Sequence, residues 1–448
     1  MAKITPRTFR GTRDFLPSEL LGRRKIVRTI EEVYRKYGFQ PLETPAIEYL
    51  EVLTGKSEEN DKLIYEIKRA RGAHTETAET AIALRYDLTV PLARVVAQYG
   101  DLPRPFKRYQ IQPVWRADRP QPRQGRYREF VQCDADILGT DSLLADAELV
   151  ALMHEVLHAL GFEGFQIRIS SRKFLAGLVE LTTGSTEKTG AFCRAIDKLD
   201  KIGWDEVKSE LAESGFNGNE IEQLLQSLQD ALGLHPDFEK AAKLLEKSAT
   251  AMAGLNEIHT VYKEALDLGV EPELLACDPT LARGLDYYTG PIFESVITYL
   301  PHMGSLSGGG RYDGLVETFT KTGVPATGMS FGLDRIQTAL IQLEKFKSAP
   351  SETQVLVARF DSEGVSENLK IAALLRKAGF RVEIWYDDDR MKKQFSYADK
   401  QQIPLVVIAG PEERAQQQAS LKNMQSGKQQ KVALDQLAQA IRAELGVV

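Results

Sequence analysis

An arginine-rich stretch between positions 104 and 128 carries residue types that bind phosphate. Its basic residues are Arg104, Lys107, Arg108, Arg116, Arg119, Arg123, Arg126 and Arg128, and its only acid is Asp118. The chain as a whole is acidic, with a formal net charge of -6 at pH 7. Guanidinium groups form planar, paired hydrogen bonds with phosphate oxygens. This local excess of positive charge therefore favours a phosphate-rich ligand held by a patch, and the overall charge argues against a uniformly basic coat for nucleic acid.

The residues that follow this stretch alternate between polar and apolar types, as in a half-buried strand. One set, expected to face the core, is Val131, Cys133, Ala135 and Ile137, and the other set is Phe130, Gln132, Asp134 and Asp136. A solvated outer face would also explain the acids, because outward polar residues are common in antiparallel sheets. The aromatic ring and the adjoining arginines favour instead a binding site on the polar face.

Two glycine-containing segments could also form part of a site. The segment Arg283–Gly290, RGLDYYTG, places a cation, an acid and two phenols between glycines that allow a ligand close to the backbone, although such a loop can also be purely structural. The triplet Gly308–Gly310 lacks the third glycine of a dinucleotide-binding fingerprint. On its own it is most simply a tight turn, because glycine is the default residue of turns. The sequence contains no P-loop motif, so any ATP must be bound by other means. Arg335 lies where a strand pattern changes to a helix pattern, a position that favours phosphate.

The segment His154–His158, HEVLH, matches the HExxH pattern that places two imidazoles one helical turn apart for zinc. The buried stripe of this helix is expected to be Leu149, Leu152, Met153, Val156 and Leu160, which leaves both histidines off it. No convincing third ligand follows in the sequence. We therefore expect no zinc site here, and a metalloprotease is the most distant of the alternatives.

Length and composition limit the classes of protein to which the chain can belong. Its 448 residues allow two to four domains at roughly 100–200 residues each. Its hydrophobic fraction of 43% and charged fraction of 27% are typical of globular proteins. No apolar run approaches the roughly 18 residues that span a membrane, and residues 1–13 lack the apolar core of a signal peptide. Three scattered cysteines, Cys133, Cys193 and Cys277, fit a reducing compartment, so we expect a cytoplasmic location without membrane contact.

The elements that must position these residues follow from hydrophobic periodicity. A helix is expected to end at Gly38, two strands are expected within 106–137, and a nearly all-helical segment spans about 174–268. A strand pattern returns at 292–299, and a strand changes to a helix near 329–336, which suggests one sheet interrupted by a helical insertion. After residues 345–351 the pattern becomes βαβα, typical of a parallel α/β domain, and it has no glycine-rich phosphate loop. This last domain is expected to be a binding module.

Taken together, these motifs resemble the histidyl-tRNA synthetase family over essentially the whole chain. The most specific matches are RGLDYYTG and GGGRYDGL, the segment Gly308–Leu315, with Gly11–Asp14, Arg116 and Gly332–Arg335 in the family order. The resemblance implies an α+β catalytic domain of the class II synthetases over 1–170 and 271–346, with an antiparallel sheet flanked by helices. It further implies a helical insertion over 171–270 and a C-terminal α/β anticodon-binding domain over 352–448. It also implies a homodimer whose interface includes the helix ending at Gly38 and the strand to Pro45.

The resemblance assigns the ATP site to four residues. Arg116 matches the arginine that binds the α-phosphate, Arg126 a loop arginine that also reaches the phosphates, Phe130 the ring that stacks on adenine, and Arg335 the arginine on the γ-phosphate. Arg283 resembles the family's catalytic arginine, which approaches the α-phosphate opposite Arg116. Mg²⁺ is expected to accompany the ATP phosphates, with no zinc and no metal held by the protein itself.

The same resemblance assigns a pocket for L-histidine. Asp87, Thr89 and Gln132 match positions that hold the α-amino group, Asp136 and Tyr288 match those that bind the imidazole, and Tyr287 lies beside them. Arg116 and Arg283 are also expected to contact the amino acid. The sequence departs from many bacterial members, because Asp87-Leu88-Thr89 replaces Glu-Gly-Thr and Asp136 replaces Glu, as in the eukaryotic-type branch. Dependence on an extra 5′ guanosine in the tRNA is therefore not inferred.

The activity implied is the activation of L-histidine with ATP to histidyl-adenylate, followed by transfer to the 3′ end of tRNA(His). One alternative is a synthetase-like regulatory subunit of histidine biosynthesis, but such proteins generally lack the anticodon domain and have degraded ATP-site arginines. Another class II synthetase would share Arg116 and Arg335 and should lack RGLDYYTG.

Overall fold

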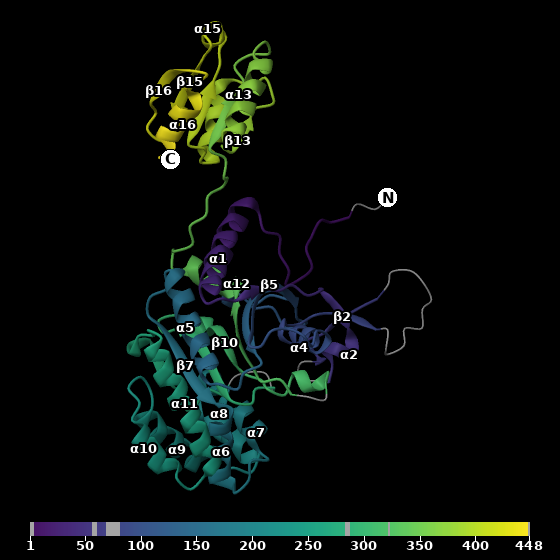
Figure 1. The fold of residues 1–448 in the computed structure, drawn as a ribbon, viewed down its shortest axis with the longest axis vertical. Coiled ribbons are helices and arrows are strands. Elements are labelled where there is room, and N and C mark those ends of the chain that lie inside the picture. The colour runs from purple at the N-terminus through teal and green to yellow at the C-terminus, as the bar shows by residue number, and fades with distance from the viewer. Residues whose placement is uncertain (1–3, 56–60, 69–80, 283–286, 321–322, 447–448) are drawn as a thin grey trace. The chain divides into compact units, whose positions relative to one another are not determined.

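The computed structural model describes residues 4–55, 61–68, 81–282, 287–320 and 323–446 (Figure 1). The chain divides into two compact units. The larger consists of Met1–Arg13 and Ile26–Lys345, and the smaller of Asp14–Lys25 and Phe346–Val448. Helix α1 (Pro17–Lys36) contributes to both units.

The larger unit is built around an eight-stranded sheet with the order β1-β5-β6-β11-β10-β9-β7-β8. The strands are β1 (Gln40–Pro41), β5 (Phe106–Trp115), β6 (Glu129–Leu138), β11 (Ala326–Gly332), β10 (Ser305–Arg311), β9 (Pro291–Ile297), β7 (Phe165–Ser171) and β8 (Leu275–Cys277). Neighbouring strands are antiparallel except at the two edges, where β1 pairs with β5 and β8 pairs with β7 in parallel. The predicted mostly antiparallel catalytic sheet is therefore confirmed.

Helices α5 (Leu144–Ala159), α11 (Ala249–Asp267) and α12 (Leu333–Gln342) pack against this sheet. Helix α5 contacts β7, β9, β10 and β11, and it runs beside α11 (Figure 1). Four residues of the predicted stripe of α5, Leu149, Leu152, Met153 and Val156, are completely inaccessible to solvent. The fifth, Leu160, directly follows the end of the helix and is half-buried. The apolar periodicity of this helix therefore determined correctly which face packs on the sheet.

A smaller three-stranded sheet, β2-β4-β3, lies in the same unit with two short helices. These elements are β2 (Ile47–Tyr49), α2 (Leu50–Leu53), β3 (Tyr65–Ile67), β4 (Ile82–Leu84) and α4 (Thr89–Gln98). Residues of α2, β4 and α4 share a hydrophobic core with Leu138, Tyr312 and Val316. The start of α4 is thereby held against the large sheet, which matters for the site.

The helical part of the larger unit lies between β7 and β8 in the chain. Its helices are α6 (Arg172–Thr183), α7 (Thr189–Ile196), α8 (Leu199–Glu213), α9 (Gly218–Ala231), α10 (Phe238–Leu245) and α11. Side-chain oxygens of Ser171, Asn217, Asp237 and Ser248 accept backbone hydrogen bonds at the starts of α6, α9, α10 and α11. Such caps satisfy amide groups that a helix start leaves unpaired.

The smaller unit contains a five-stranded sheet with the order β13-β12-β14-β15-β16. Its elements are β12 (Val355–Ala358), α13 (Val365–Lys377), β13 (Val382–Ile384), α14 (Met391–Lys400), β14 (Leu405–Ile408), α15 (Pro411–Ala415), β15 (Gln418–Asn423), β16 (Gln429–Ala433) and α16 (Leu437–Leu445). The predicted parallel strands are β13, β12 and β14. The antiparallel hairpin β15–β16 was not predicted, so the sheet is mixed rather than parallel throughout.

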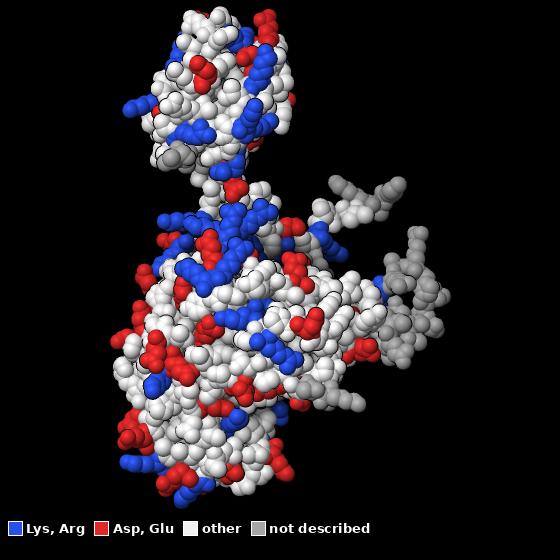
Figure 2. Space-filling model, in the orientation of Figure 1, with Lys and Arg blue, Asp and Glu red and all other residues white. Residues whose placement is uncertain are grey.

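Acidic and basic side chains are interspersed on the visible face, with basic residues gathered over α1 (Figure 2). Helix α1 itself contains Arg23, Arg24, Lys25 and Arg28. Within the described residues, none of the helices combines the length and the apolar character needed to cross a membrane.

Candidate active site

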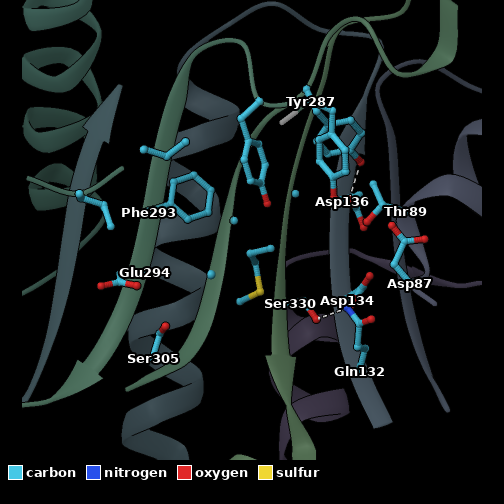
Figure 3. Close-up of a pocket in the computed structure, with 18 of the residues that line it drawn as sticks. Asp87, Thr89, Gln132, Asp134, Asp136, Tyr287, Phe293, Glu294, Ser305 and Ser330 are labelled. Carbon is cyan, nitrogen blue, oxygen red and sulfur yellow. Dashed lines mark hydrogen bonds between the residues drawn. The ribbon is translucent and has the colours of Figure 1, made fainter. Parts of the chain in front are cut away.

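A cavity of about 230 Å³ opens where β6, β11 and β10 run side by side (Figure 3). The six residues that the sequence assigned to histidine alone line it, namely Asp87, Thr89, Gln132, Asp136, Tyr287 and Tyr288. Figure 3 shows Asp87 and Thr89 on one side of the cavity and Phe293 and Glu294 on the other. The structure therefore brings together residues that are far apart in the sequence.

A second cavity of about 320 Å³ adjoins the first. The residues that the sequence assigned to ATP line it, namely Arg116, Arg126, Phe130 and Arg335, together with Arg119. The two cavities share Arg116, Gln132, Ser305, Gly308 and Ser330. One continuous site thus has a cationic part and a part lined by carboxylates and phenols.

Arg116 lies at the junction of the two cavities, immediately after β5. Its Nε donates a hydrogen bond to the carbonyl oxygen of Tyr86 at 2.9 Å, and its Nη2 lies 3.4 Å from Oε1 of Gln132. Its guanidinium carbon is 5.2 Å from the ring centroid of Phe130. These contacts hold the guanidinium in a fixed orientation before any ligand binds, which is the condition for electrostatic stabilisation without reorganisation.

Arg335 lies at the start of α12, as predicted. Its Nη1 donates to the carbonyl oxygen of Ser305, and the adjacent Asp334 forms an ion pair with Arg13 and accepts a hydrogen bond from the Val131 amide at 3.0 Å. Gly125 has a φ of +67°, and a Cβ there would lie 2.8 Å from the Cα of Arg335. Glycine is therefore required where the arginine-rich loop passes the helix start.

Asp136 is the most constrained carboxylate of the first cavity. Its Oδ1 accepts a hydrogen bond from the Tyr312 hydroxyl, and its Oδ2 lies 2.8 Å from Nη2 of Arg108 in an ion pair. Burial raises the pKa of Asp136, and the Arg108 cation opposes that rise. Arg108 and the Tyr312 hydroxyl therefore offset part of the cost of holding a negative charge at this buried position.

Glycines make room for this carboxylate. Gly328 on β11 is paired with Asp136 on β6, and a Cβ at Gly328 would lie 1.9 Å from Asp136 Oδ1. Gly309 lies inside β10, where a Cβ would meet the Gly328 carbonyl oxygen at 2.3 Å. The interpretation of Gly308–Gly310 as a tight turn was therefore wrong, because the triplet belongs to the central strand β10. Gly309 has no room for a side chain, since strand β11 and the ring of Phe293 lie close to it.

Asp87 and Thr89 lie at the beginning of α4. Oδ1 of Asp87 accepts a hydrogen bond from the Val90 amide at 3.2 Å, while Oδ2 is buried without a hydrogen-bonding partner among the described residues. Burial raises the pKa of Asp87 to about 6, against the lowering effect of Arg116. An unpaired acceptor facing a cavity suits a ligand that carries a cationic nitrogen.

Tyr287 and Tyr288 contribute two buried phenols with ring centroids 5.1 Å apart. Burial raises the pKa of both hydroxyls, so they are neutral and can donate hydrogen bonds at physiological pH. Arg283, which the resemblance assigns to catalysis together with Arg116, lies outside the described residues.

Several residues of the site were not assigned a role from the sequence. Asp134 and Ser330 line the first cavity, and Gln132 Nε2 donates to both of them, at 3.3 Å and 3.0 Å. Asp134 could have been assigned from its position on the polar face of β6. Arg108 required the strand register, because it is paired with Asp136 across β5 and β6. Tyr312 required the tertiary structure, which brings its hydroxyl to Asp136.

The sequence offered no convincing third ligand for His154 and His158, but the structure places the Glu271 carboxylate beside both imidazoles. Oε2 of Glu271 lies 3.1 Å from Nε2 of His154 and 3.0 Å from Nε2 of His158. Glu271 is 113 residues beyond His158 in the chain, so sequence spacing could not reveal it.

Comparisons with known proteins agree with the geometry. A family model described as histidyl-tRNA synthetase matches residues 11–336, and one described as anticodon binding domain matches residues 354–444. A histidine–tRNA ligase of Gloeobacter violaceus is 43% identical, covering 98% of both chains, and one of Cytophaga hutchinsonii is 43% identical, covering 96% of this chain and 97% of the relative. The crystal structure of histidyl-tRNA synthetase from Nostoc sp. PCC 7120 is similar with a TM-score of 0.84 and 36% identity, covering 98% of this chain and 100% of that one.

The matched model spans most of the chain, and relatives above 40% identity extend over nearly all of it. Both halves of the expected architecture are present in the order that the sequence motifs predicted. The chain belongs to the histidyl-tRNA synthetase family.

Proposed function

We propose that this protein is a histidine–tRNA ligase that activates L-histidine with ATP and transfers the histidyl group to the 3′ end of tRNA(His). The observation that carries the proposal is the position of Arg116, which lines both cavities. A ligand carboxylate in the first cavity and a phosphate chain in the second would meet beside its guanidinium. Attack of the carboxylate oxygen on the α-phosphorus forms histidyl-adenylate and breaks the bond to the pyrophosphate leaving group.

The ATP part of the proposal assigns each residue of the second cavity a task. Arg116 and Arg126 bind the α-phosphate region, Phe130 stacks on adenine, and Arg335 binds the γ-phosphate. Negative charge grows at the α-phosphate in the transition state, and preorganised guanidinium groups stabilise it without reacting. Arg283 would approach the same phosphate from the opposite side, as the resemblance implies.

Mg²⁺ is proposed to bind with the ATP phosphates. The carboxylates that line the second cavity are Asp118 and Asp334, and Asp334 already contacts Arg13 and the Val131 amide. Asp118 is exposed to solvent, so it could contact such an ion only at the opening of the second cavity. Phosphate and water oxygens would therefore supply most of the ligands, which is the usual arrangement for Mg²⁺. The ion would neutralise charge on the phosphates.

The amino-acid part of the proposal assigns the α-ammonium group to Asp87, Thr89 and Gln132. The imidazole would contact Asp136 and the Tyr288 hydroxyl, with Tyr287 closing the pocket. A carboxylate and a phenol can satisfy both imidazole nitrogens. An amino acid without these nitrogens would leave buried polar groups unpaired, which is a strong basis for rejection.

The C-terminal domain is proposed to bind the anticodon stem-loop. A cavity of about 500 Å³ in this domain is lined by Trp385, Arg390, Lys392, Lys393, Ser396, Tyr397 and Lys400. Basic side chains attract the nucleic-acid backbone, and Trp385 offers a ring on which a base can stack. A regulatory paralogue without ligase activity would have little use for this domain.

The remaining assignments follow from the family. We propose the boundaries 1–170 with 271–346 for catalysis, 171–270 for the insertion and 352–448 for the anticodon-binding domain. We also propose a homodimer in the cytoplasm, with the end of α1 and the edge strand β1 at the interface. Light scattering on the purified protein would establish the oligomeric state.

Histidine-dependent exchange of pyrophosphate into ATP, assayed with all twenty amino acids, tests the proposed function. We expect exchange with histidine far above exchange with any other amino acid, and charging of tRNA(His). Exchange with a different amino acid would indicate another class II synthetase. Histidine binding without exchange would indicate a regulatory paralogue.

A further inference from the structure

Three side chains that line neither the ATP nor the amino-acid cavity converge on one point. His154 and His158 project from α5, and Glu271 lies just before the short 3₁₀ turn η2 (Pro272–Leu274). The distances are 3.1 Å for His154 Nε2 to Glu271 Oε2, 3.0 Å for His158 Nε2 to the same oxygen, and 3.2 Å between the two Nε2 atoms. Three potential ligand atoms thus form a nearly equilateral triangle.

The fold holds these side chains in place. Residues four apart on a helix lie one above the other on the same face. The ring centroid of Phe165 on β7 lies 5.8 Å from that of His154 and 5.1 Å from that of His158, and the Phe165 ring makes an edge-type contact with both imidazoles. The backbone around Glu271 is fixed by a Val270 amide bonded to the Ala265 carbonyl at 3.1 Å and a Glu271 carbonyl that accepts from Leu274 at 3.0 Å.

No placement of hydrogen atoms makes all three contacts of this triangle favourable hydrogen bonds. A carboxylate oxygen only accepts, and each Nε2 carries at most one hydrogen when the imidazole is neutral. If both imidazoles donate to Glu271, two N–H groups face each other across the remaining 3.2 Å edge. If one Nε2 is unprotonated, its lone pair faces the carboxylate instead. With a cation bound between them, the two nitrogen lone pairs and a carboxylate lone pair would all point toward one positive charge, and all three contacts would be favourable.

The three separations of 3.0–3.2 Å are close to those that such a cation sets, although slightly shorter. An ion bound tetrahedrally with ligand bonds of about 2.0–2.1 Å separates its ligand atoms by roughly 3.3–3.4 Å. Two imidazole nitrogens and one carboxylate oxygen are donors preferred by zinc and similar transition metals rather than by magnesium or calcium. We propose that His154, His158 and Glu271 form a binding site for a divalent transition-metal ion, with zinc as the typical occupant and water completing the coordination.

The surroundings favour a structural role for this site over a hydrolytic one. In HExxH proteases the glutamate between the histidines acts as the general base, but here Glu155 forms an ion pair with Lys36 at 2.9 Å. The proposed ligands join α5, which packs on the catalytic sheet, to the segment that leaves α11 at the end of the helical part. A bound ion would therefore fasten the last helix of that part to the sheet domain, and would stabilise the folded chain by mass action.

Cobalt is the probe for the test, because tetrahedral Co²⁺ absorbs visible light strongly. Full-length protein without an affinity tag is titrated with Co²⁺ in the absence of ATP and Mg²⁺, followed by displacement with Zn²⁺. We expect the signal to saturate at about one equivalent per chain. The variants His158→Asn and Glu271→Gln should weaken binding by at least about 10–100-fold, since even indirect partners of metal ligands have effects of that size.

Two matched controls separate the site from general surface effects. Glu273→Gln makes the same change two residues from Glu271, at another exposed position, and His235→Asn removes an exposed histidine elsewhere. Both should bind Co²⁺ like the unmodified protein, and Zn²⁺ should raise the unfolding temperature of these controls but not of His158→Asn or Glu271→Gln. Absence of saturable binding, or equal affinity in His158→Asn and the unmodified protein, would overturn the proposal.

Discussion

Arg108 and Asp136 face each other across strands β5 and β6, with Arg108 Nη2 2.8 Å from Asp136 Oδ2. The Arg108 side chain is completely buried, and Asp134 lies 4.0 Å from the same guanidinium. Asp134 and Asp136, which both line the first cavity, thus share one buried cation that compensates their charge, the Arg108 guanidinium. The residues proposed to bind the imidazole are therefore also part of the buried interior that stabilises the fold.

The first prediction concerns Arg108→Met, which removes the cation and leaves buried carboxylates uncompensated. We expect a loss of about 3–5 kcal/mol in the free energy of unfolding, the range for breaking a buried ion pair from one side. Urea-induced unfolding of the histidine-free protein would measure it. Arg119→Met, at an exposed arginine beside the second cavity, is the matched control and should change stability little. Equal effects of both substitutions would contradict the role given to Arg108.

The second prediction concerns Asp136→Asn, which keeps the size of the side chain and removes its charge. Histidine binding should weaken far more than ATP binding, because an imidazole partner is lost and the phosphate contacts remain. The Michaelis constants for histidine and ATP in pyrophosphate exchange would show the difference. Tyr312→Phe removes only the hydroxyl that donates to Asp136, so it should cause a smaller change in the same direction. Equal losses for both substrates would refute the assignment.

The site could be predicted from the sequence where the evidence was local. The alternation along β6 placed Phe130, Gln132 and Asp136 on one face, and specific motifs indicated Tyr287 and Tyr288. Arg108 was missed because its importance comes from pairing between strands, and Tyr312 because its hydroxyl meets Asp136 only in the folded chain. No local pattern encodes either contact. Gly308–Gly310 was misinterpreted for the same reason, since the crowding that demands glycine comes from β11 and Phe293.

In the fold, too, local features could be predicted from the sequence and features that depend on tertiary pairing could not. Helix α5 and the strands of the large sheet follow from hydrophobic periodicity, and the family resemblance supplied their arrangement. Strand β16 was missed because its side chains are mostly exposed and polar, so it has no apolar alternation. Its partner β15 supplies the backbone hydrogen bonds that make it a strand. The contact between Glu271 and the histidines of α5 depends on tertiary packing and could not be inferred from spacing.

The third prediction concerns the C-terminal domain. A chain ending at Lys347 should retain some adenylate formation and lose most tRNA charging, because the proposed anticodon contacts are removed while both cavities remain. Pyrophosphate exchange and tRNA charging would be compared on the same preparation, with circular dichroism to verify folding. A finer variant, Trp385→Ala, should weaken tRNA binding by about 1–3 kcal/mol if a base stacks there. Unimpaired charging by the folded, shortened chain would refute the assignment.

The fourth prediction concerns Arg283, whose proposed role rests on the family resemblance. Arg283→Ala should lower the rate of adenylate formation roughly 100-fold or more, the size typical for one preorganised electrostatic group. Arg283→Lys keeps a charge and loses the planar fork, so it should also be impaired. Single-turnover measurements at saturating ATP and histidine separate the chemical step from binding. A near-normal rate would show that Arg116 and Arg335, with Mg²⁺ on the phosphates, suffice.

The fifth prediction concerns pH and rests on Asp87. Burial raises the pKa of its carboxyl group to about 6 in the histidine-free protein. Its contribution to stability is therefore present at acidic pH and is lost as the pH rises through about 6. A ligand α-ammonium group needs the ionised carboxylate, so histidine affinity should fall as the pH decreases below about 6, by up to about tenfold per pH unit.

The imidazole of histidine itself titrates near pH 6.5, so a control must separate the two groups. Asp87→Asn removes the protein carboxylate and leaves the ligand titration unchanged. Histidine affinity measured by calorimetry between about pH 5 and pH 8 should be weaker in the variant, and its slope below about pH 6 should be shallower by one proton. The difference between the two slopes isolates Asp87, because everything that titrates on the ligand contributes equally to both. Parallel slopes would mean that Asp87 stays ionised throughout, and that Arg116 outweighs the effect of burial on this carboxylate.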